Sequence, residues 1–159
     1  MPLIRFRQAV PEETVALWAL RTRCVREICS SHYPAQVIAP WAASPPPASY
    51  PALLAAGGGV VAETPEGPLL GYGVFDVPGN EISALFVDPA QGGQGIGQAL
   101  LGRLLGQADP ARAVVLSASL NAVPFYRRAG FEVVGEARYA HPCGIELDAV
   151  TMRRWVAGR

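Results

Sequence analysis

A glycine-rich loop between a strand-like run and a helix-like run constrains this chain most. The apolar run 81–87 ends at Asp88-Pro89, glycines recur over 92–97, and residues 98–105 have a helical pattern. Glycines leave the backbone N–H groups of such a loop uncovered, and the start of the next helix adds a partial positive charge. The pattern predicts a strand–loop–helix unit that holds an anion, in particular a phosphate or pyrophosphate.

The composition limits the class of protein. Hydrophobic residues make up 50% of the 159 residues, and 13 basic residues balance 13 acidic ones. We therefore expect one globular domain over 1–159, and neither a disordered chain nor a nucleic-acid-binding protein. No apolar run is long enough to span a membrane and no signal peptide is evident, so we expect a cytoplasmic protein. Cys24, Cys29 and Cys143 are too few and too widely spaced for a disulfide framework or a metal site, and we expect Cys24 to be buried.

The hydrophobic pattern predicts a mixed α/β fold. Pro11 and two acidic residues open a long helix, whose buried stripe is expected to be Leu17, Trp18, Cys24, Val25 and Ile28. Three strands with short turns precede the glycine loop as an antiparallel meander, and the run 113–117 is expected to be a strand buried on both faces. The expected strands are 3–8, 60–63, 69–77, 81–87, 113–117, 131–139 and 145–155, and the expected helices are 11–31, 34–41, 50–56, 98–107 and 121–130.

Two common phosphate-binding loops do not fit the glycine loop. A P-loop needs a lysine after its last glycine, and all 13 basic residues of this chain are arginines. A dinucleotide-binding loop needs an acidic residue at the end of the next strand, whereas the expected strand here ends in Leu116-Ser-Ala-Ser119. A loop that only makes a tight turn is the structural alternative.

A second group of residues spans 121–131. Asn121 is a good helix N-cap and Gly130 a good helix terminator, with Phe125 and Tyr126 one turn into the helix. Taken alone, these two aromatic residues are more typical of a core than of a catalytic site.

In this order, the two groups resemble the signature of the GNAT superfamily of N-acetyltransferases. The matching residues are Leu85, Val87, Pro89, Gly93, Gly95, Gly97, Asn121, Phe125, Tyr126, Gly130 and Phe131. The resemblance extends over the full chain, and residues 33–37, Trp41 and 144–147 are similar to one bacterial branch. It implies a mixed, mostly antiparallel twisted sheet of about seven strands, flanked by helices and splayed at its central strands.

The resemblance also implies acetyl-CoA as the acyl donor. The backbone of Leu85, Phe86 and Val87 would bind the pantetheine arm. The pyrophosphate would lie on the loop and helix start, formed by Gly92, Gly93, Gln94, Gly95, Ile96, Gly97 and Gln98, with further contacts from Asn121, Phe125 and Arg128. Gly92 is a departure, because the family usually has Gln or Arg there, and Gln94 replaces a frequent Lys or Arg. The backbone N–H groups of the loop should still bind the pyrophosphate, and Arg127 or Arg128 would supply the positive charge that the loop lacks.

The implied chemistry is direct acyl transfer with a general base and a general acid. Tyr126 matches the position that often protonates the leaving thiolate, and a backbone N–H near Val87 would hold the oxyanion. Glu81 matches a glutamate that deprotonates the amine through water, and the two-residue period of a strand predicts that it shares a face with Leu85. A surface carboxylate is the alternative interpretation of Glu81. Glu146 and His141 are the next candidates for the base, and His32 is either a further candidate or a residue that ends a helix.

The expected partner is an amine of a small molecule or peptide, with no nucleic acid, membrane or metal, and a homodimer is allowed. Residues 32–56 and 138–146 would shape the acceptor pocket, where Tyr33, Trp41, Tyr50 and Tyr139 form either an aromatic wall or core. A non-catalytic coenzyme A-binding sensor or scaffold module is the alternative function.

Overall fold

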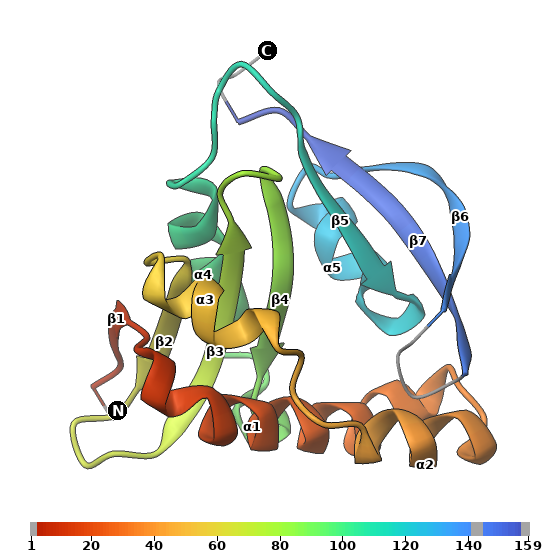
Figure 1. The fold of residues 1–159 in the computed structure, drawn as a ribbon, viewed down its shortest axis with the longest axis horizontal. Helices are drawn as coiled ribbons and strands as arrows, with labels where there is room; N and C mark the ends of the chain where they lie inside the picture. Colours follow the sequence, from red (N-terminus) through yellow and green to blue (C-terminus); the bar gives the residue numbers. More distant parts are fainter. Residues whose placement is uncertain (1–2, 141–144, 157–159) are drawn as a thin grey trace.

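Seven strands form one sheet in the order β1-β2-β3-β4-β5-β7-β6. The computed structural model describes residues 3–140 and 145–156 (Figure 1). The elements are β1 (Arg5–Gln8), α1 (Thr14–Glu27), α2 (Ala35–Ala43), α3 (Ser49–Ala55), β2 (Gly59–Glu63), β3 (Leu69–Asp76), β4 (Glu81–Val87), α4 (Ile96–Leu105), β5 (Val114–Ser119), α5 (Val123–Arg128), β6 (Glu132–Ala140) and β7 (Glu146–Arg154).

The sheet consists of two antiparallel halves that diverge at its centre. Strands β1 to β4 form one half and β5, β7 and β6 form the other. The two halves are joined through β4 and β5, which run parallel and pair only at Glu81 opposite Val115. Beyond this point β4 and β5 move apart, as Figure 1 shows. The expected meander and the splay at the central strands are both confirmed.

Helices cover both faces of the β1–β4 half, because its strands alternate between two hydrophobic clusters. Val61, Tyr72 and Val74 face one way and pack with residues of α1 and α3. Val60 and Ala62 face the other way and pack with α4. This alternation is what a sheet buried on both faces requires. It allows α4, the helix that follows the glycine loop, to pack against one face of the sheet.

A register shift in β4 changes which residues share a face. Glu81 pairs with Asp76 and Leu85 pairs with Gly73, but one additional residue of β4, Ser83, has no partner between them. Such a bulge moves all residues beyond it to the opposite face. Glu81 and Leu85 therefore lie on opposite faces of the strand, and the prediction that they share one is wrong.

Two burial predictions also need correction. In β5, Leu116 and Ala118 are buried but Ser117 is exposed, so the strand is buried on one face only. Residues of both faces, 116–119, line the cavity between β4 and β5. At the end of α1, Cys24 and Val25 are buried as expected, whereas Ile28 lies beyond the last helical turn and is exposed. Among the described residues, no helix has both the length and the apolar character to cross a membrane.

An ion-pair network fixes the first strand to the second. Glu63 is buried, and its carboxylate accepts hydrogen bonds from Arg5 at 2.7 Å and from Arg7 at 3.0 Å. Arg7 also donates to Glu13 at 2.6 Å. These hydrogen bonds from arginine hold the pKa of both carboxyls below their ordinary value of 4.5.

Replacing Glu63 by Gln is expected to lower the free energy of unfolding by about 1–2 kcal/mol at pH 7. Because the pKa of this carboxyl is lower in the folded protein, its contribution is complete above the ordinary pKa and is lost as the pH falls through the lowered one. Urea unfolding of both proteins between pH 7 and pH 3 should show their curves converging. Glu132→Gln, which breaks an exposed pair with Arg153, is the control and should change stability by less than about 0.5 kcal/mol. A Glu63→Gln deficit that is independent of pH would contradict the ionic origin of the effect.

Candidate active site

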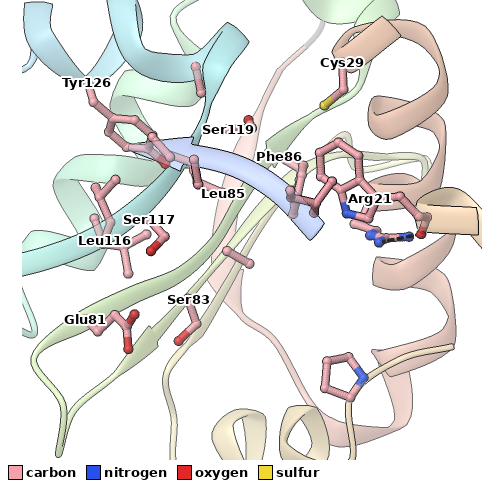
Figure 2. Close-up of a pocket in the computed structure, with 18 of the residues that line it drawn as sticks. Arg21, Cys29, Glu81, Ser83, Leu85, Phe86, Leu116, Ser117, Ser119 and Tyr126 are labelled. Atoms are coloured by element: carbon pink, nitrogen blue, oxygen red, sulfur yellow. Dashed lines mark hydrogen bonds between the residues drawn. The ribbon is translucent and has the colours of Figure 1, made fainter. Parts of the chain in front are cut away.

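A cavity of about 360 Å³ lies where β4 and β5 diverge. Its walls come from α1, α2, α3, α5 and β7 as well as from these two strands. Four residues predicted for the site line it: Glu81, Leu85, Phe86 and Tyr126. Figure 2 shows Glu81 and Tyr126 entering from different elements, β4 and α5. The splay thus opens the sheet where the motifs place the chemistry.

A second cavity, of about 240 Å³, lies over the glycine loop. Its lining contains the predicted donor-binding residues Val87, Gly92, Gly93, Gln94, Gly95, Ile96, Gly97, Gln98, Phe125 and Arg128.

The two cavities are neighbours along both β4 and α5. Phe86 lines the larger cavity and Val87 the smaller one, and Tyr126 and Phe125 are divided in the same way. An elongated ligand with its phosphates on the loop would therefore reach the splay along β4. Here Cys24 donates to the carbonyl oxygen of Val87 at 3.2 Å, so one of the backbone groups predicted to bind the ligand already has a partner.

The loop keeps its backbone open to an anion. Gly93 and Gly95 have φ of +81° and +75°, a region that favours glycine, and a Cβ at either position would meet no atom within 4 Å. The first N–H groups of α4, which begins at Ile96, have no acceptor within the helix and add its dipole. Gly92 differs, because its φ is −62° and a Cβ there would lie 4.0 Å from the nearest atom. A side chain is therefore sterically allowed at the position where the family usually has one.

The predicted cap at Asn121 is wrong. A short 3-10 turn over 120–122 precedes α5, whose N-cap residue is Ala122. Within the described part of the chain, the side-chain oxygen Oδ1 of Asn121 is buried and has no hydrogen-bond partner. A buried acceptor of this kind normally has a donor. Asn121 lines neither of the two cavities, so the structure does not bring it together with the other residues predicted to bind the donor.

Tyr126 is held rigidly beside the splay. Its ring makes edge contacts with Phe125 and Phe131 at centroid distances of 5.2 and 5.6 Å. Gly130, with φ +93°, ends α5 as predicted, and the N–H of Phe131 donates back to the carbonyl of Tyr126. Burial raises the pKa of the Tyr126 phenol well above its ordinary value of 10. The hydroxyl therefore remains protonated and can donate at neutral pH.

Glu81 lies at the last point of contact between the two half-sheets. It is half-buried, and both burial and the nearby charge of Asp76 raise the pKa of its carboxyl. A carboxylate with a raised pKa is a better proton acceptor, which suits a base. Of the other candidates, Glu146 is exposed and paired with Arg138, and His32 is exposed beside Ser31, both outside the two cavities. His141 lies outside the described residues.

The far wall of the larger cavity contains the predicted aromatic residues Tyr33, Trp41 and Tyr50. The side chain of Tyr139 lies outside what the structure describes. Residues that the sequence did not indicate also line this cavity: Trp18, Arg21, Cys29, Ser83, Ser117, Ser119 and Asp148. An arginine within the apolar face of α1 was the one available signal.

Two cavities that meet along β4 and α5 fit an elongated donor whose phosphates lie on the glycine loop and whose other end reaches the splay. The sequence profile of the acetyltransferase (GNAT) domain matches residues 32–153, most of the chain. The protein therefore belongs to the GNAT acetyltransferase family, as its motifs predict. None of the curated protein sequences is significantly similar to it.

Solved structures of acetyltransferases share this fold. A GCN5-related N-acetyltransferase from Rhodopseudomonas palustris has a TM-score of 0.81 at 22% identity, over 98% of this chain and 96% of that one. The PaiA N-acetyltransferase from Thermoplasma acidophilum, in complex with coenzyme A, has a TM-score of 0.71 at 16% identity, over 97% and 99%. YncA from Salmonella typhimurium, with its cofactor acetyl-CoA, has a TM-score of 0.65 at 22% identity, over 99% and 96%. These similarities confirm the predicted fold.

Proposed function

We propose that this acetyltransferase moves an acetyl group from acetyl-CoA to an amine of a small molecule or peptide. The observation that carries the proposal is the junction of the loop cavity and the splay cavity along Phe86-Val87 and Phe125-Tyr126. Membership of the family supports it, as do the coenzyme A and acetyl-CoA complexes of the structurally similar PaiA and YncA.

The donor residues divide by the chemistry that they offer. The open N–H groups of 92–98 and the start of α4 suit a pyrophosphate. The edge of β4 at 85–87, which lines both cavities, suits the amide groups of a pantetheine arm. When bound, acetyl-CoA supplies an activated acyl thioester, and the chain supplies position and proton handling.

Glu81 and Tyr126 would handle the protons. Glu81 accepts the proton that the amine must lose before it attacks. Tyr126 donates a hydrogen bond to the sulfur as negative charge develops on it. Because the pKa of Tyr126 is raised, whereas a thiol has an ordinary value near 8.5, complete proton transfer from the phenol is uphill. This difference in pKa supports stabilisation of the thiolate by a hydrogen bond.

Arg128 is expected to supply the charge that Gly92 lacks. Arg128 lines the loop cavity and Arg127 does not, so Arg128→Ala should weaken coenzyme A binding about tenfold and Arg127→Ala should have little effect. Gly92→Arg should tighten binding about three- to tenfold, because a Cβ there would lie 4.0 Å from the nearest atom and the side chain adds a charge near the phosphates. Isothermal titration calorimetry with coenzyme A measures all three variants. Equal losses for the two alanine variants would show that neither arginine makes a specific contact.

The alternative, a non-catalytic coenzyme A-binding module, is separated from the enzyme by two measurements on the same preparation. Calorimetry measures acetyl-CoA binding, and a thiol reagent detects coenzyme A released in the presence of amines. Binding with thiol release supports the enzyme, binding without release from any amine supports the module, and no binding overturns both.

We also propose one domain over 1–159 that acts in the bacterial cytoplasm as a monomer or homodimer. The balanced charge supports partners other than nucleic acids and membranes.

A further inference from the structure

Three aromatic side chains line the part of the larger cavity that lies between α1, α2 and β4. Trp18 comes from α1, Trp41 from α2 and Phe86 from β4. Each is only partly buried although it packs against the core, so ring surface remains open to the cavity.

A tyrosine supports each of these rings. Ring centroids lie 5.3 Å apart for Trp18–Tyr50, 5.2 Å for Trp41–Tyr33 and 5.7 Å for Phe86–Tyr72. The hydroxyl of Tyr33 donates to the carbonyl of Asp148 and accepts from the N–H of Leu120 at 3.1 Å. Through Tyr33, the wall formed by the rings of Trp18, Trp41 and Phe86 is connected to the second half-sheet.

Hydrogen bonds also fix α1 to α2 behind the wall. The guanidinium of Arg21 donates to the carbonyl of Trp41 at 2.9 Å and to the hydroxyl of Ser44 at 3.2 Å, and it lies 4.1 Å from the centre of the Trp18 ring. The indole N–H of Trp18 donates to the carbonyl of Ser44 at 2.7 Å. Figure 2 shows Arg21 at this wall, beside Phe86. The arginine charge is engaged in holding the wall together.

Charge and size further restrict the ligand. Three charged residues line the cavity: Glu81, Asp148 and Arg21. Asp148 is paired with Arg138 at 3.3 Å, and Arg21 contacts Trp41, Ser44 and the Trp18 ring. The carboxylate of Glu81 therefore favours a cationic amine over an acidic ligand. The cavity volume of about 360 Å³ is near the lower limit for small-molecule pockets, and the acyl end of the donor would occupy part of it.

From this wall we infer that the acceptor is a small primary amine on a flat, apolar, aromatic body without an acidic group. The ring packs against Trp18, Trp41 and Phe86, and the amine points toward Glu81. This inference rests on the proposed function, because it describes the acceptor side of the same site.

Calorimetry on the full chain saturated with coenzyme A tests the inference without turnover. Phenethylamine should bind at least tenfold more tightly than n-butylamine, which has the same amine but no ring, and more tightly than trialanine. Trp41→Leu, which removes the ring but leaves an apolar side chain, should reduce the ratio to below about threefold and leave coenzyme A affinity unchanged. Trp155→Leu is the control, because Trp155 is an exposed residue outside both cavities, and it should keep the full ratio.

Equal binding of the two amines, or tighter binding of trialanine, would overturn the inference. If coenzyme A still bound in that experiment, the proposed function would be unaffected. Loss of coenzyme A binding by the unaltered protein would overturn both. If Trp41→Leu does not fold, Phe86→Leu takes its place. A ratio that persists in a folded variant of the wall would also overturn the inference.

Discussion

Tyr126→Phe is expected to lower kcat about tenfold to hundredfold while the affinity for coenzyme A stays within about twofold. A hydrogen bond to a charged group contributes about 1.5–3 kcal/mol, and the sulfur becomes charged only as the thioester breaks. The loss should therefore appear in kcat and in kcat/KM equally, with little change in KM for acetyl-CoA. Steady-state kinetics with both substrates varied, together with calorimetry, gives each value.

The pH dependence separates a hydrogen-bond donor from a conventional general acid. Because burial raises the pKa of Tyr126, the phenol stays protonated throughout the accessible alkaline range. Neither the wild-type protein nor Tyr126→Phe should lose activity at high pH through this group. An alkaline limb present in the wild type and absent from the variant would mean that Tyr126 ionises in the working range. Unchanged kcat in Tyr126→Phe would exclude the residue from the chemistry.

The sequence predicts the parts of this site that depend on neighbouring residues. The loop follows from glycines between a strand and a helix, and in the structure Gly93 and Gly95 do adopt left-handed φ values. The end of α5 at Gly130 follows from the same property. Such features are local, so one sequence suffices to place them.

Features that depend on distant packing were not predictable in the same way. The bulge at Ser83 depends on how β3 and β4 pair, and a pattern with a period of two places Glu81 on the wrong face. Asn121 has a typical capping side chain, but the 3-10 turn before α5 takes it out of the cap position. Arg21 on the apolar face of α1 was a local signal, but the sequence of the helix does not show that Trp18 and Arg21 line the cavity, because this depends on how α1 packs beside the splay.

Glu81→Gln is expected to lower kcat about hundredfold at pH 7, the effect of removing a general base. The deficit should shrink as the pH rises toward the pKa of the amine, near 10 for an alkylamine, because a growing fraction of the acceptor then needs no base. Assays from pH 6 to 9.5 with one amine measure both proteins. The wild type should also show an acid limb, because protonated Glu81 cannot accept a proton. Parallel profiles, with a deficit that is the same at every pH, would exclude Glu81 as the base.

Asp76→Asn gives this prediction an independent control. Burial and, to a smaller extent, the charge of Asp76 raise the pKa of Glu81, so removing that charge should move the acid limb of the wild-type profile to lower pH. Asparagine retains an oxygen for the weak bond that Asp76 accepts from the N–H of Gly79 at 3.4 Å, so the turn should survive the change. Because the substitution alters the protonation of Glu81 and not its position, kcat on the plateau should remain within about twofold. If the acid limb of the pH–kcat profile shifts while kcat on the plateau is unchanged, Glu81 is the titrating group. If the acid limb does not shift, the titration belongs to another residue.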